Sequence, residues 1–465
     1  MSSPVLHVNE MRAWEESSWA AGILPGEVIA RAGEKLAARL LEITAPTDRI
    51  LLLAGKGNNG QDTLRMEPFL RGRRTVTHLR ILDPSVDDGP LNSLLSAGVD
   101  WVVDGLFGIG LSRRLSPAWQ RIIETLNASG AAIASVDVPS GLDAQTGLPM
   151  PMAVRARITL TLGAAKSGLL RPTAWEFCGR LEVLPDIGLI PADFKTDWRT
   201  SDRTDFREFS KPRPIAAHKG TFGHALLLAG SVGYHGAAVL AARSALGAGP
   251  GLVTVLTDPH TYIPVASQTV SAMVHPWGEH LPVVPSAIAA GPGLASPHLP
   301  EFCRAQVIRL WQNAPVPMIV DASALDWLPP GSPLSVAPRV LTPHPGEAAR
   351  LLSLTPAEIQ SDRPGALRLL SRRFGNAWVV LKGHQSLAGN GRSEIYFNLT
   401  GNPGLAQGGS GDVLTGFLLG MLAQPAFQAD PLTTIRHALW HHGATADLLS
   451  LRQPRWTAQT LAESL

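Results

Sequence analysis

Two glycine-rich stretches carry polar side chains in patterns that could do chemistry. The first is Gly55–Asp62, GKGNNGQD, directly after the apolar run Arg49–Ala54. The second is Gly408–Asp412, GGSGD, which opens onto an apolar segment of helical spacing. Free backbone N–H groups in a glycine loop, together with the positive end of a helix, can hold an anion such as a phosphate. The carboxylate of Asp412 could cap that helix, or it could take a proton from a bound hydroxyl or water.

Further carboxylates and amides follow apolar runs of the first half. Asp104 ends one run, Asp137 ends another, and Asp62 lies in the first glycine loop. Because the carboxyl ends of parallel strands meet at one edge of a sheet, we expect these three carboxylates to converge. Each of them alone could equally be a helix cap or a turn residue. The adjacent amides of Asn58 and Asn59 could offer oxygens to a cation or a ligand.

Two more loops of the second half point to a binding site. His344 and Glu347 stand in the turn LTPHPGE, which its prolines make rigid. Lys382 ends an apolar run, where a lysine either extends to solvent or needs an anionic partner. We expect a nucleotide phosphate to be that partner. Asp321 and the turn Gly291–Gly293 would lie at the same sheet edge.

Apolar runs that alternate with helical patterns must position these groups, which predicts βαβ units and mostly parallel sheets. A helical pattern covers 10–41, and a closing helix is predicted over Asp412–Gln424. The predicted strands of the first half are Arg49–Ala54, Trp101–Asp104, Ala131–Asp137 and Ile158–Leu162. Those of the second half are Ala225–Ala229, Leu252–Leu256, Ala287–Ala290, Met318–Asp321 and Trp378–Lys382.

Length and composition predict a globular protein of two domains. A polar, charged stretch from Pro191 to Pro214 interrupts the alternation and is predicted to be a linker, with domains over 1–207 and 208–465. A net charge of +2 without a dense basic run argues against nucleic acid as a partner. The first residues have no apolar core and the most apolar stretch contains Arg243 and Pro250, so we expect a cytoplasmic protein without a membrane span. Two cysteines without a CxxC spacing predict no disulfide framework.

The motifs of the first half resemble NAD(P)H-hydrate epimerases. GKGNNGQD, VDGLFGIGLSRRL, VDVPSGLDAQTG and TLGAAKSGLL occur in that family's order and cover most of residues 1–190. The resemblance implies that Asn59, Asp104 and Ser140 hold a K⁺ ion, an oxygen site suited to a hard cation. It implies that Asp137 moves a proton or hydroxyl at carbon 6 of the hydrated nicotinamide. The implied contacts of that hydrate are Asn58, Asn59, Gly60, Gln61, Asp62, Gly108, Ile109, Gly110, Leu111, Ser112, Arg113, Arg114 and Asp137.

One departure from that family concerns the first glycine loop. The family's loop reads GNNGGDG, whereas Gln61 and Thr63 stand here in place of glycines. If these positions need a positive φ or a close backbone approach, their side chains would obstruct the loop.

The second half resembles ADP/ATP-dependent NAD(P)H-hydrate dehydratases, which are ribokinase-like. HKGTFGHALLLAGS, GAAVLAARSALGAGPGLVTV, AAGPGL, VDASAL, LTPHPGEAARLL, LKGHQSL and GNPGLAQGGSGDVLTG match in order across 217–425. Only Ser323 departs, where the family has a second aspartate. The implied fold is therefore a Rossmann-like three-layer α/β domain followed by a ribokinase-like α/β domain.

The second resemblance also implies a site and its ligands. Asp412 would act as the base, and the glycine loop would hold the developing phosphate charge. ADP or ATP would be the co-substrate, with Mg²⁺, and the chain would form a homo-oligomer. Lys382, Gly383, His384, Gln385, Ser386 and Gly411 would bind the nucleotide. Ala237, Gly293, His344 and Asp412 would contact the hydrated NADH or NADPH.

Three functions stay open at this point. The first is repair of hydrated NAD(P)H, with epimerisation of its R and S forms by the first half and nucleotide-dependent dehydration of the S form by the second. In the second, only the dehydratase is active, and the first half is a binding or assembly module weakened by Gln61 and Thr63. The third is a ribokinase-like vitamin kinase, although the motifs of the first half fit repair alone.

Overall fold

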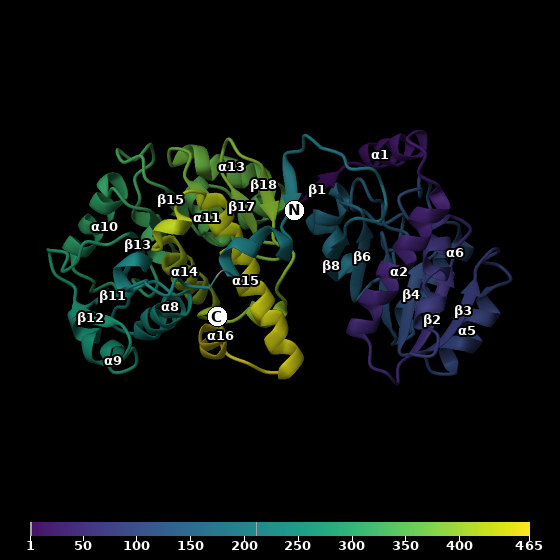
Figure 1. Cartoon of the computed structure of the whole chain (residues 1–465), viewed down its shortest axis with the longest axis horizontal. Coiled ribbons are helices and arrows are strands. Elements are labelled where there is room, and N and C mark those ends of the chain that lie inside the picture. The colour runs from purple at the N-terminus through teal and green to yellow at the C-terminus, as the bar shows by residue number, and fades with distance from the viewer. Residues whose placement is uncertain (1, 211) are drawn as a thin grey trace. The chain divides into compact units, whose positions relative to one another are not determined.

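The computed structural model describes residues 2–210 and 212–465. The chain divides into two units, Ser3–Thr196 and Asp197–Leu465. Figure 1 labels the helices and strands of both units. Each unit has its own hydrophobic core, formed by clusters of buried residues that belong to that unit alone. None of the described helices is both long enough and apolar enough to cross a membrane.

The first unit is built on a parallel sheet with the strand order β3-β2-β4-β5-β6-β8. A separate parallel pair joins β1 (Ser3–Leu6) to β7 (Ala165–Lys166). The strands of the sheet are β2 (Arg49–Ala54), β3 (Thr75–Arg80), β4 (Trp101–Gly105), β5 (Ala132–Val136), β6 (Ile158–Leu162) and β8 (Arg180–Leu184). The helices are α1 (Val8–Ala20), α2 (Pro25–Ile43), α3 (Asn58–Leu64), α4 (Glu67–Leu70), α5 (Asp88–Ser96), α6 (Pro117–Ala128) and α7 (Trp175–Cys178).

Helices cover both faces of this sheet, because successive side chains of a strand point to opposite faces. In β2, Ile50 and Leu52 belong to one buried cluster and Leu51 and Leu53 to another. The first cluster includes the apolar stripe of α2, with members at intervals of four residues: Val28, Ala32, Leu36 and Leu40. The second includes residues of α5 and α6: Leu91, Ile122, Ile123 and Leu126. The predicted three-layer architecture is confirmed.

The second unit is built on a larger mixed sheet with the order β12-β11-β10-β13-β14-β15-β16-β17-β18-β9. The strands β12, β11, β10, β13, β14, β15 and β16 run parallel. β17 pairs antiparallel with β16, and β18 pairs antiparallel with β17. The strands are β9 (Trp198–Thr200), β10 (His224–Leu228), β11 (Leu252–Thr257), β12 (Met273–Pro276), β13 (Ala287–Ala290), β14 (Met318–Val320), β15 (Arg339–Leu341), β16 (Trp378–Leu381), β17 (Leu387–Gly389) and β18 (Ile395–Phe397).

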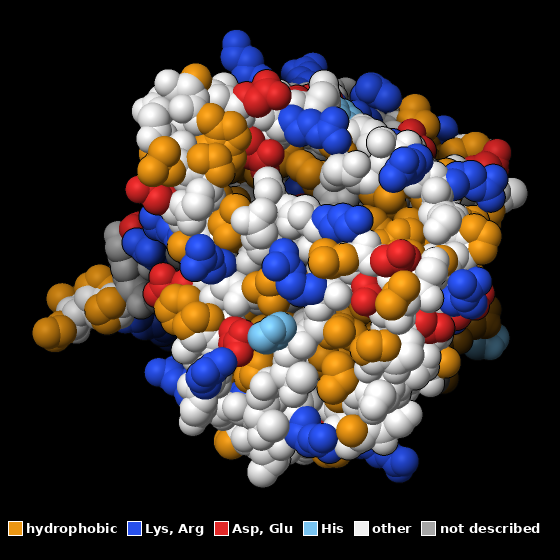
Figure 2. All heavy atoms as spheres, turned by 90° about the vertical axis from the view of Figure 1, so that its right-hand side faces the viewer, with side chains coloured by type: hydrophobic (Ala, Val, Ile, Leu, Met, Phe, Trp, Pro, Cys, Tyr) orange, Lys and Arg blue, Asp and Glu red, His pale blue; other side chains and the backbone are white. Residues whose placement is uncertain are grey.

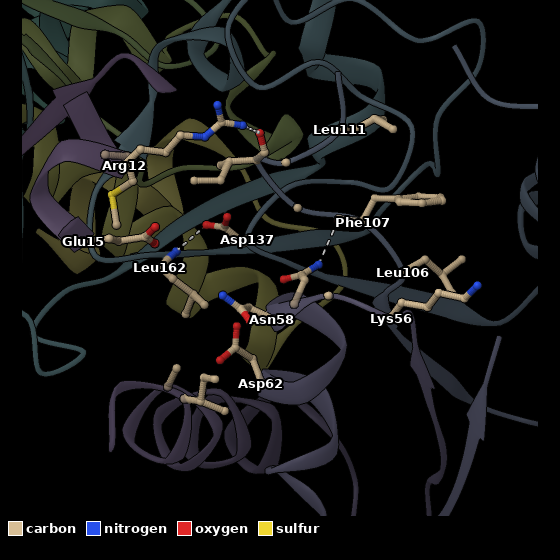
Figure 3. Close-up of a pocket in the computed structure, with 18 of the residues that line it drawn as sticks. Arg12, Glu15, Lys56, Asn58, Asp62, Leu106, Phe107, Leu111, Asp137 and Leu162 are labelled. Carbon is tan, nitrogen blue, oxygen red and sulfur yellow. Dashed lines mark hydrogen bonds between the residues drawn. The ribbon is translucent and has the colours of Figure 1, made fainter. Parts of the chain in front are cut away.

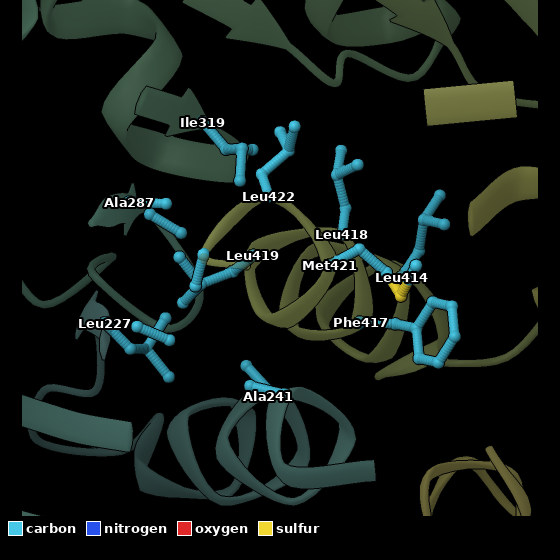
Figure 4. Packing of buried hydrophobic residues seen from close by; sticks show 14 of the residues in the cluster. Leu227, Ala241, Ala287, Ile319, Leu414, Phe417, Leu418, Leu419, Met421 and Leu422 are labelled. Carbon is cyan, nitrogen blue, oxygen red and sulfur yellow. The ribbon is translucent and has the colours of Figure 1, made fainter. Parts of the chain in front are cut away.

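Three helices pack on one face of this sheet: α8 (His235–Gly247), α14 (Ser410–Leu422) and α15 (Pro431–Arg452). Figure 4 shows α14 beside α8, with Leu419 directed toward Leu227 and Ala287 of the strands. Gly416 allows this close approach, since a Cβ atom there would lie 2.0 Å from the carbonyl oxygen of Ala241. The remaining helices are α9 (Tyr262–Ala266), α10 (Glu301–Asn313), α11 (Pro345–Leu352), α12 (Pro356–Ser361), α13 (Arg363–Arg373) and α16 (Ala458–Ser464).

The predicted linker over 191–214 is wrong for much of its length. Residues 198–200 form β9, which pairs in parallel with β18. The 3₁₀ segment η3 (Arg203–Ser210) follows, and within it Asp205 forms an ion pair with Arg436 of α15. Phe209 stacks on His437 with ring centroids 4.2 Å apart. These contacts assign residues 197–207 to the second unit, so the chain divides after residue 196 rather than after 207. The polar composition misled because only a few large apolar side chains, Trp198, Phe206 and Phe209, anchor the segment to the second unit.

Candidate active sites in the two units

The first candidate site lies where the strand order of the first unit reverses. β2 has β3 on one side and β4 on the other, and ligands of open α/β sheets bind outside the carboxyl ends of the strands at such a point. The loops that follow β2 and β4 line a cavity of about 820 Å³ there, together with residues of α1 and α2. Figure 3 shows the polar side chains that face it.

Most of the residues that the epimerase resemblance implied as contacts line this cavity. They are Asn58, Asn59, Asp62, Asp137 and the loop residues Gly108, Ile109, Gly110, Leu111, Ser112 and Arg113. Three implied contacts are not among the lining residues: Gly60, Gln61 and Arg114.

The substituted glycine positions do not obstruct the loop. Gln61 and Thr63 both lie within the helix α3, and neither has a positive φ. Gln61 is exposed and Thr63 is buried, with its hydroxyl donating to the carbonyl oxygen of Asn59 at 2.9 Å. A Cβ atom at Gly105 would lie 1.9 Å from the Thr63 Oγ1 atom, so the glycine makes room for the threonine.

Asp137 is held by a buried lysine that sequence reasoning did not assign to a site. Its Oδ1 atom accepts hydrogen bonds from the Lys166 ammonium, from the backbone N–H of Leu162 at 3.0 Å and from the Thr161 hydroxyl at 3.3 Å. The backbone of Asp137 has a φ of 63°, a left-handed conformation that costs a non-glycine residue on the order of 1–3 kcal/mol. Backbone strain together with a buried ion pair at a cavity wall is typical of a functional residue.

Two more carboxyls share the cavity with Asp137. Asp62 projects from α3 and Glu15 from α1 (Figure 3). Burial, together with the negative charges of Asp137 and Glu15, raises the pKa of Asp62 well above its ordinary value. Burial and the charge of Asp137 also raise the pKa of Glu15.

The three residues implied to hold potassium lie in one hydrogen-bonded group. The hydroxyl of Ser140 donates to Asp104 Oδ1 at 2.6 Å, and the amide of Asn59 donates to the carbonyl oxygen of Phe107 at 2.8 Å. The backbone N–H of Phe107 in turn donates to the Ser140 hydroxyl at 2.9 Å. Asp104 is fully buried, and burial raises its pKa even though Ser140 and Ser135 donate hydrogen bonds to it.

The second candidate site occupies the carboxyl ends of the strands of the second unit. Here β10 lies between β11 and β13, so the reversal of strand order falls at the loops after β10 and β13. Those loops touch, since the Ser231 hydroxyl donates to the carbonyl oxygen of Gly293 at 2.6 Å. A Cβ atom at Gly293 would lie 3.0 Å from the Ala237 Cβ atom, so these two implied hydrate contacts are neighbours.

Lys382 has an anionic partner within the protein, Asp321, in addition to the nucleotide phosphate that the sequence predicts for it. Its ammonium lies 2.7 Å from Asp321 Oδ1 and 3.9 Å from Glu347 Oε2. Burial would lower the pKa of Lys382, but the charges of Asp321 and Glu347 outweigh it and raise that pKa. Burial would raise the pKa of Asp321, but the charge of the Lys382 ammonium outweighs burial, so this pKa lies below its ordinary value. The pair therefore stays charged.

Asp412 lies next to this pair, in the first turn of α14. A Cβ atom at its neighbour Gly411 would lie 3.4 Å from the Lys382 Nζ atom. One turn further, the Thr415 hydroxyl donates to Asp321 Oδ2 at 2.7 Å, which ties α14 to the end of β14. Burial and the charge of Asp321 raise the pKa of Asp412 to about 7, although Lys382 opposes the shift. A carboxyl with a pKa near neutrality suits proton transfer.

Comparisons with known proteins match both halves of the chain. Residues 225–465 match the family described as NAD(P)H-hydrate dehydratase, and residues 76–168 match the YjeF-related protein N-terminus. The bifunctional NAD(P)H-hydrate repair enzyme Nnr of Gloeobacter violaceus is 33% identical over 95% of this chain and 93% of its own length. The chain belongs to the NAD(P)H-hydrate repair enzyme family.

Further relatives agree with that family. The bifunctional repair enzyme Nnr of Escherichia coli is 31% identical over 96% of this chain and 90% of its own length. Among solved structures, a ribokinase-like superfamily protein from Enterococcus faecalis is 25% identical with a TM-score of 0.50, covering 59% of this chain and 96% of that one. The predicted ribokinase-like fold of the second unit is confirmed.

Other residues that the dehydratase resemblance implied at the second site lie at the start of α11 and in the loop after β16. His344 caps α11 and is half exposed, with its Nδ1 atom accepting from the backbone N–H of Gly346 at 3.0 Å and its Nε2 atom 3.4 Å from Glu347 Oε1. The loop after β16 carries Gly383 with a φ of 129° and Gln385 with a φ of 50°. His384 is exposed, and burial of part of its ring lowers its pKa. Ser386 donates to the carbonyl oxygen of Gly383 at 2.9 Å.

Sequence reasoning missed several members of both sites. Thr415 could have been found, because it follows Asp412 by three residues and so lies on the same face of the helix. His442 of α15 has no motif around it, although its ring contacts the Ser410 carbonyl oxygen at 3.1 Å. Lys166 lies within the motif TLGAAKSGLL, but no role was predicted for its side chain. Glu15 lies in a segment that carries no motif.

Proposed function

We propose that this chain repairs hydrated NAD(P)H. The second unit dehydrates the S form in a reaction coupled to ADP or ATP with Mg²⁺, and the first unit interconverts the R and S forms. One observation carries the proposal: Asp412 lies at the mouth of a glycine-opened helix, beside the buried Lys382–Asp321 pair, on a ribokinase-like sheet. The family to which the chain belongs supports the same function.

The geometry suggests how the second unit would work. The backbone N–H groups of Gly408–Gly411 and the helix end would hold phosphate. Lys382 is neutralised by Asp321 in the free protein, so it would place a fixed ammonium at the phosphates without an uncompensated buried charge. Asp412 would take the proton from the hydroxyl of the hydrate. His344 and the neighbouring Ala237 and Gly293 would contact the ring.

The test of the dehydratase follows the absorbance of reduced nicotinamide. We expect the purified chain with hydrated NADH to restore that absorbance only when ADP or ATP and Mg²⁺ are added. A comparison of the rates with ADP and with ATP then identifies the co-substrate. Consumption of nucleotide with a vitamin alcohol, and none with the hydrate, would show a kinase instead. Recovery with the S form alone, and never from the R form, would show that only the dehydratase is active.

Potassium belongs to the proposal for the first unit, and the donor set fits it. Asn59 Oδ1 is buried and has no hydrogen-bond partner among the described residues, beside the oxygens of Asp104 and Ser140. A cation held by these three residues would supply positive charge at the wall of the cavity. We expect epimerisation to need K⁺, and the Asn59→Ala variant to need about tenfold more K⁺ for half-maximal rate. The exposed Asn92, replaced by alanine, is the control.

The proposal also includes a homo-oligomer, as the resemblance implies, and a cytoplasmic location, as the residues of the N-terminus and of the most apolar stretch predict. Sedimentation of the purified chain measures the assembly state, and a monomer at micromolar concentration would contradict it.

A further inference from the structure

Three carboxyl groups from three elements meet in the cavity of the first unit. Glu15 comes from α1, Asp62 from α3 and Asp137 from the end of β5. Figure 3 shows the three around one space. The ammonium of Lys166 forms an ion pair with Asp137. The interactions that raise the pKa of Asp62 include the charges of both other carboxyls, so Asp62 interacts electrostatically with Asp137 and Glu15.

The environments of Asp62 and Asp137 differ in kind. Asp137 Oδ1 accepts three hydrogen bonds, one of them from an ammonium, and each of these favours the charged carboxylate. The side chain of Asp62 is only 7% exposed and accepts no hydrogen bond from any described residue. A buried carboxyl without donors, facing two other carboxyls, favours the protonated form. A buried carboxyl with a raised pKa, close to a carboxylate that is paired with an ammonium, is the usual arrangement for an acid and a base.

The substrate of the proposed epimerase calls for such a pair. Carbon 6 of the hydrate carries a hydroxyl and is bonded to the ring nitrogen, whose lone pair can expel the hydroxyl, so carbon 6 can invert when the hydroxyl leaves from one face and a water adds on the other. We propose that Asp62 is the acid of this reaction and Asp137 its base. The proposal rests on the epimerase activity proposed above.

The step balances with water alone. Asp62 gives its proton to the hydroxyl oxygen, the carbon–oxygen bond breaks with its electron pair on that oxygen, and water leaves. The lone pair of the ring nitrogen forms a double bond to carbon 6. A second water attacks from the opposite face and loses a proton to Asp137. Return of that proton to Asp62, directly or through solvent, restores the enzyme, and the reverse direction exchanges the two roles.

The experiment uses the full chain with the purified R form and K⁺ but without nucleotide. We expect Asp62→Asn to lower kcat for epimerisation about 100-fold or more, the usual loss for a missing acid, and to change KM less than about threefold. The matched control is Glu16→Gln, since Glu16 is the exposed neighbour of Glu15 on α1 and does not line the cavity. It should keep the wild-type kcat. Circular dichroism and the preserved KM show that the Asp62→Asn unit is folded.

Isotope uptake gives a second readout that a structural role would not move. In ¹⁸O-water each wild-type inversion should place one labelled oxygen at carbon 6, because the attacking water differs from the one that leaves. Inversion without label would overturn the proposal, and so would an Asp62→Asn variant with more than about one tenth of the wild-type kcat. A wild-type chain that does not epimerise would overturn the proposed epimerase activity itself, which the first two outcomes would leave standing.

Discussion

At the scale of single residues, the protonation of Asp412, the proposed base, would decide when the second site can work. A base acts in its deprotonated form, and burial with the charge of Asp321 holds the pKa of this carboxyl at about 7. The same interactions oppose folding at high pH. A carboxyl whose pKa is raised in the folded state lowers stability as the pH rises through that pKa, because the unfolded chain loses the proton more easily.

Asp412→Asn should therefore have two opposite effects. We expect a loss of about 100-fold or more in kcat for nucleotide-dependent dehydration, because the base is gone. At pH 8 we also expect the variant to melt at a higher temperature, by at least about 2 °C, roughly the shift that 1 kcal/mol gives a unit of this size. Rates of the wild type between pH 5.5 and 8.5 should rise with a midpoint near 7. Full activity of the variant would remove the assigned base.

At the scale of an element, the loop after β16 depends on a buried arginine from a helix. Arg363, in the first turn of α13, donates to the carbonyl oxygen of Leu381 at 3.2 Å and to the Gln360 side chain at 3.2 Å. A Cβ atom at Gly383 would lie 2.8 Å from the Arg363 Nη1 atom. Burial lowers the pKa of Arg363 to about 10, which leaves it charged at neutral pH. The guanidinium thus fixes the end of the strand from which the proposed nucleotide contacts project.

Replacing Arg363 should weaken nucleotide binding more than it slows the reaction. For Arg363→Met we expect the KM for nucleotide to rise about tenfold or more, since a lost charged hydrogen bond costs roughly 1.5–3 kcal/mol. The expected change in kcat is less than about threefold. Arg373→Met, at the exposed end of the same helix, is the control and should change neither constant. Equal losses in kcat and in kcat/KM would assign Arg363 to the reaction step instead.

The elements also show where sequence reasoning works and where it stops. β2 and β13 begin and end where predicted, because a strand buried on both faces is a nearly unbroken apolar run. β6 also begins and ends where predicted, although two buried threonines alternate with its apolar residues. β3 and β12 were missed, since each lies at the edge of its sheet and is largely exposed. The partner of Lys382 could not be read from the sequence either. Asp321 is distant along the chain and becomes its neighbour only through the order β14-β15-β16.

At the scale of the whole molecule, nucleotide should stabilise one unit and leave the other unchanged. The buried clusters of the two units share no residue, and the proposed nucleotide contacts all belong to the second unit. A ligand at 100 times its Kd adds about 2.7 kcal/mol to the unit that binds it. In calorimetry with ADP or ATP we therefore expect one unfolding transition to move up and the other to stay. A shift of both transitions would show that the units unfold together.

The fit between Thr63 and Gly105 bears on how the first glycine loop could have changed. A Cβ atom at position 105 would also lie 2.9 Å from the Asn59 carbonyl oxygen, so glycine is required there whatever residue occupies position 63. The space next to the helix therefore does not depend on which side chain stands at position 63. A glycine at that position would leave the space empty, and the backbone at position 105 would need no change.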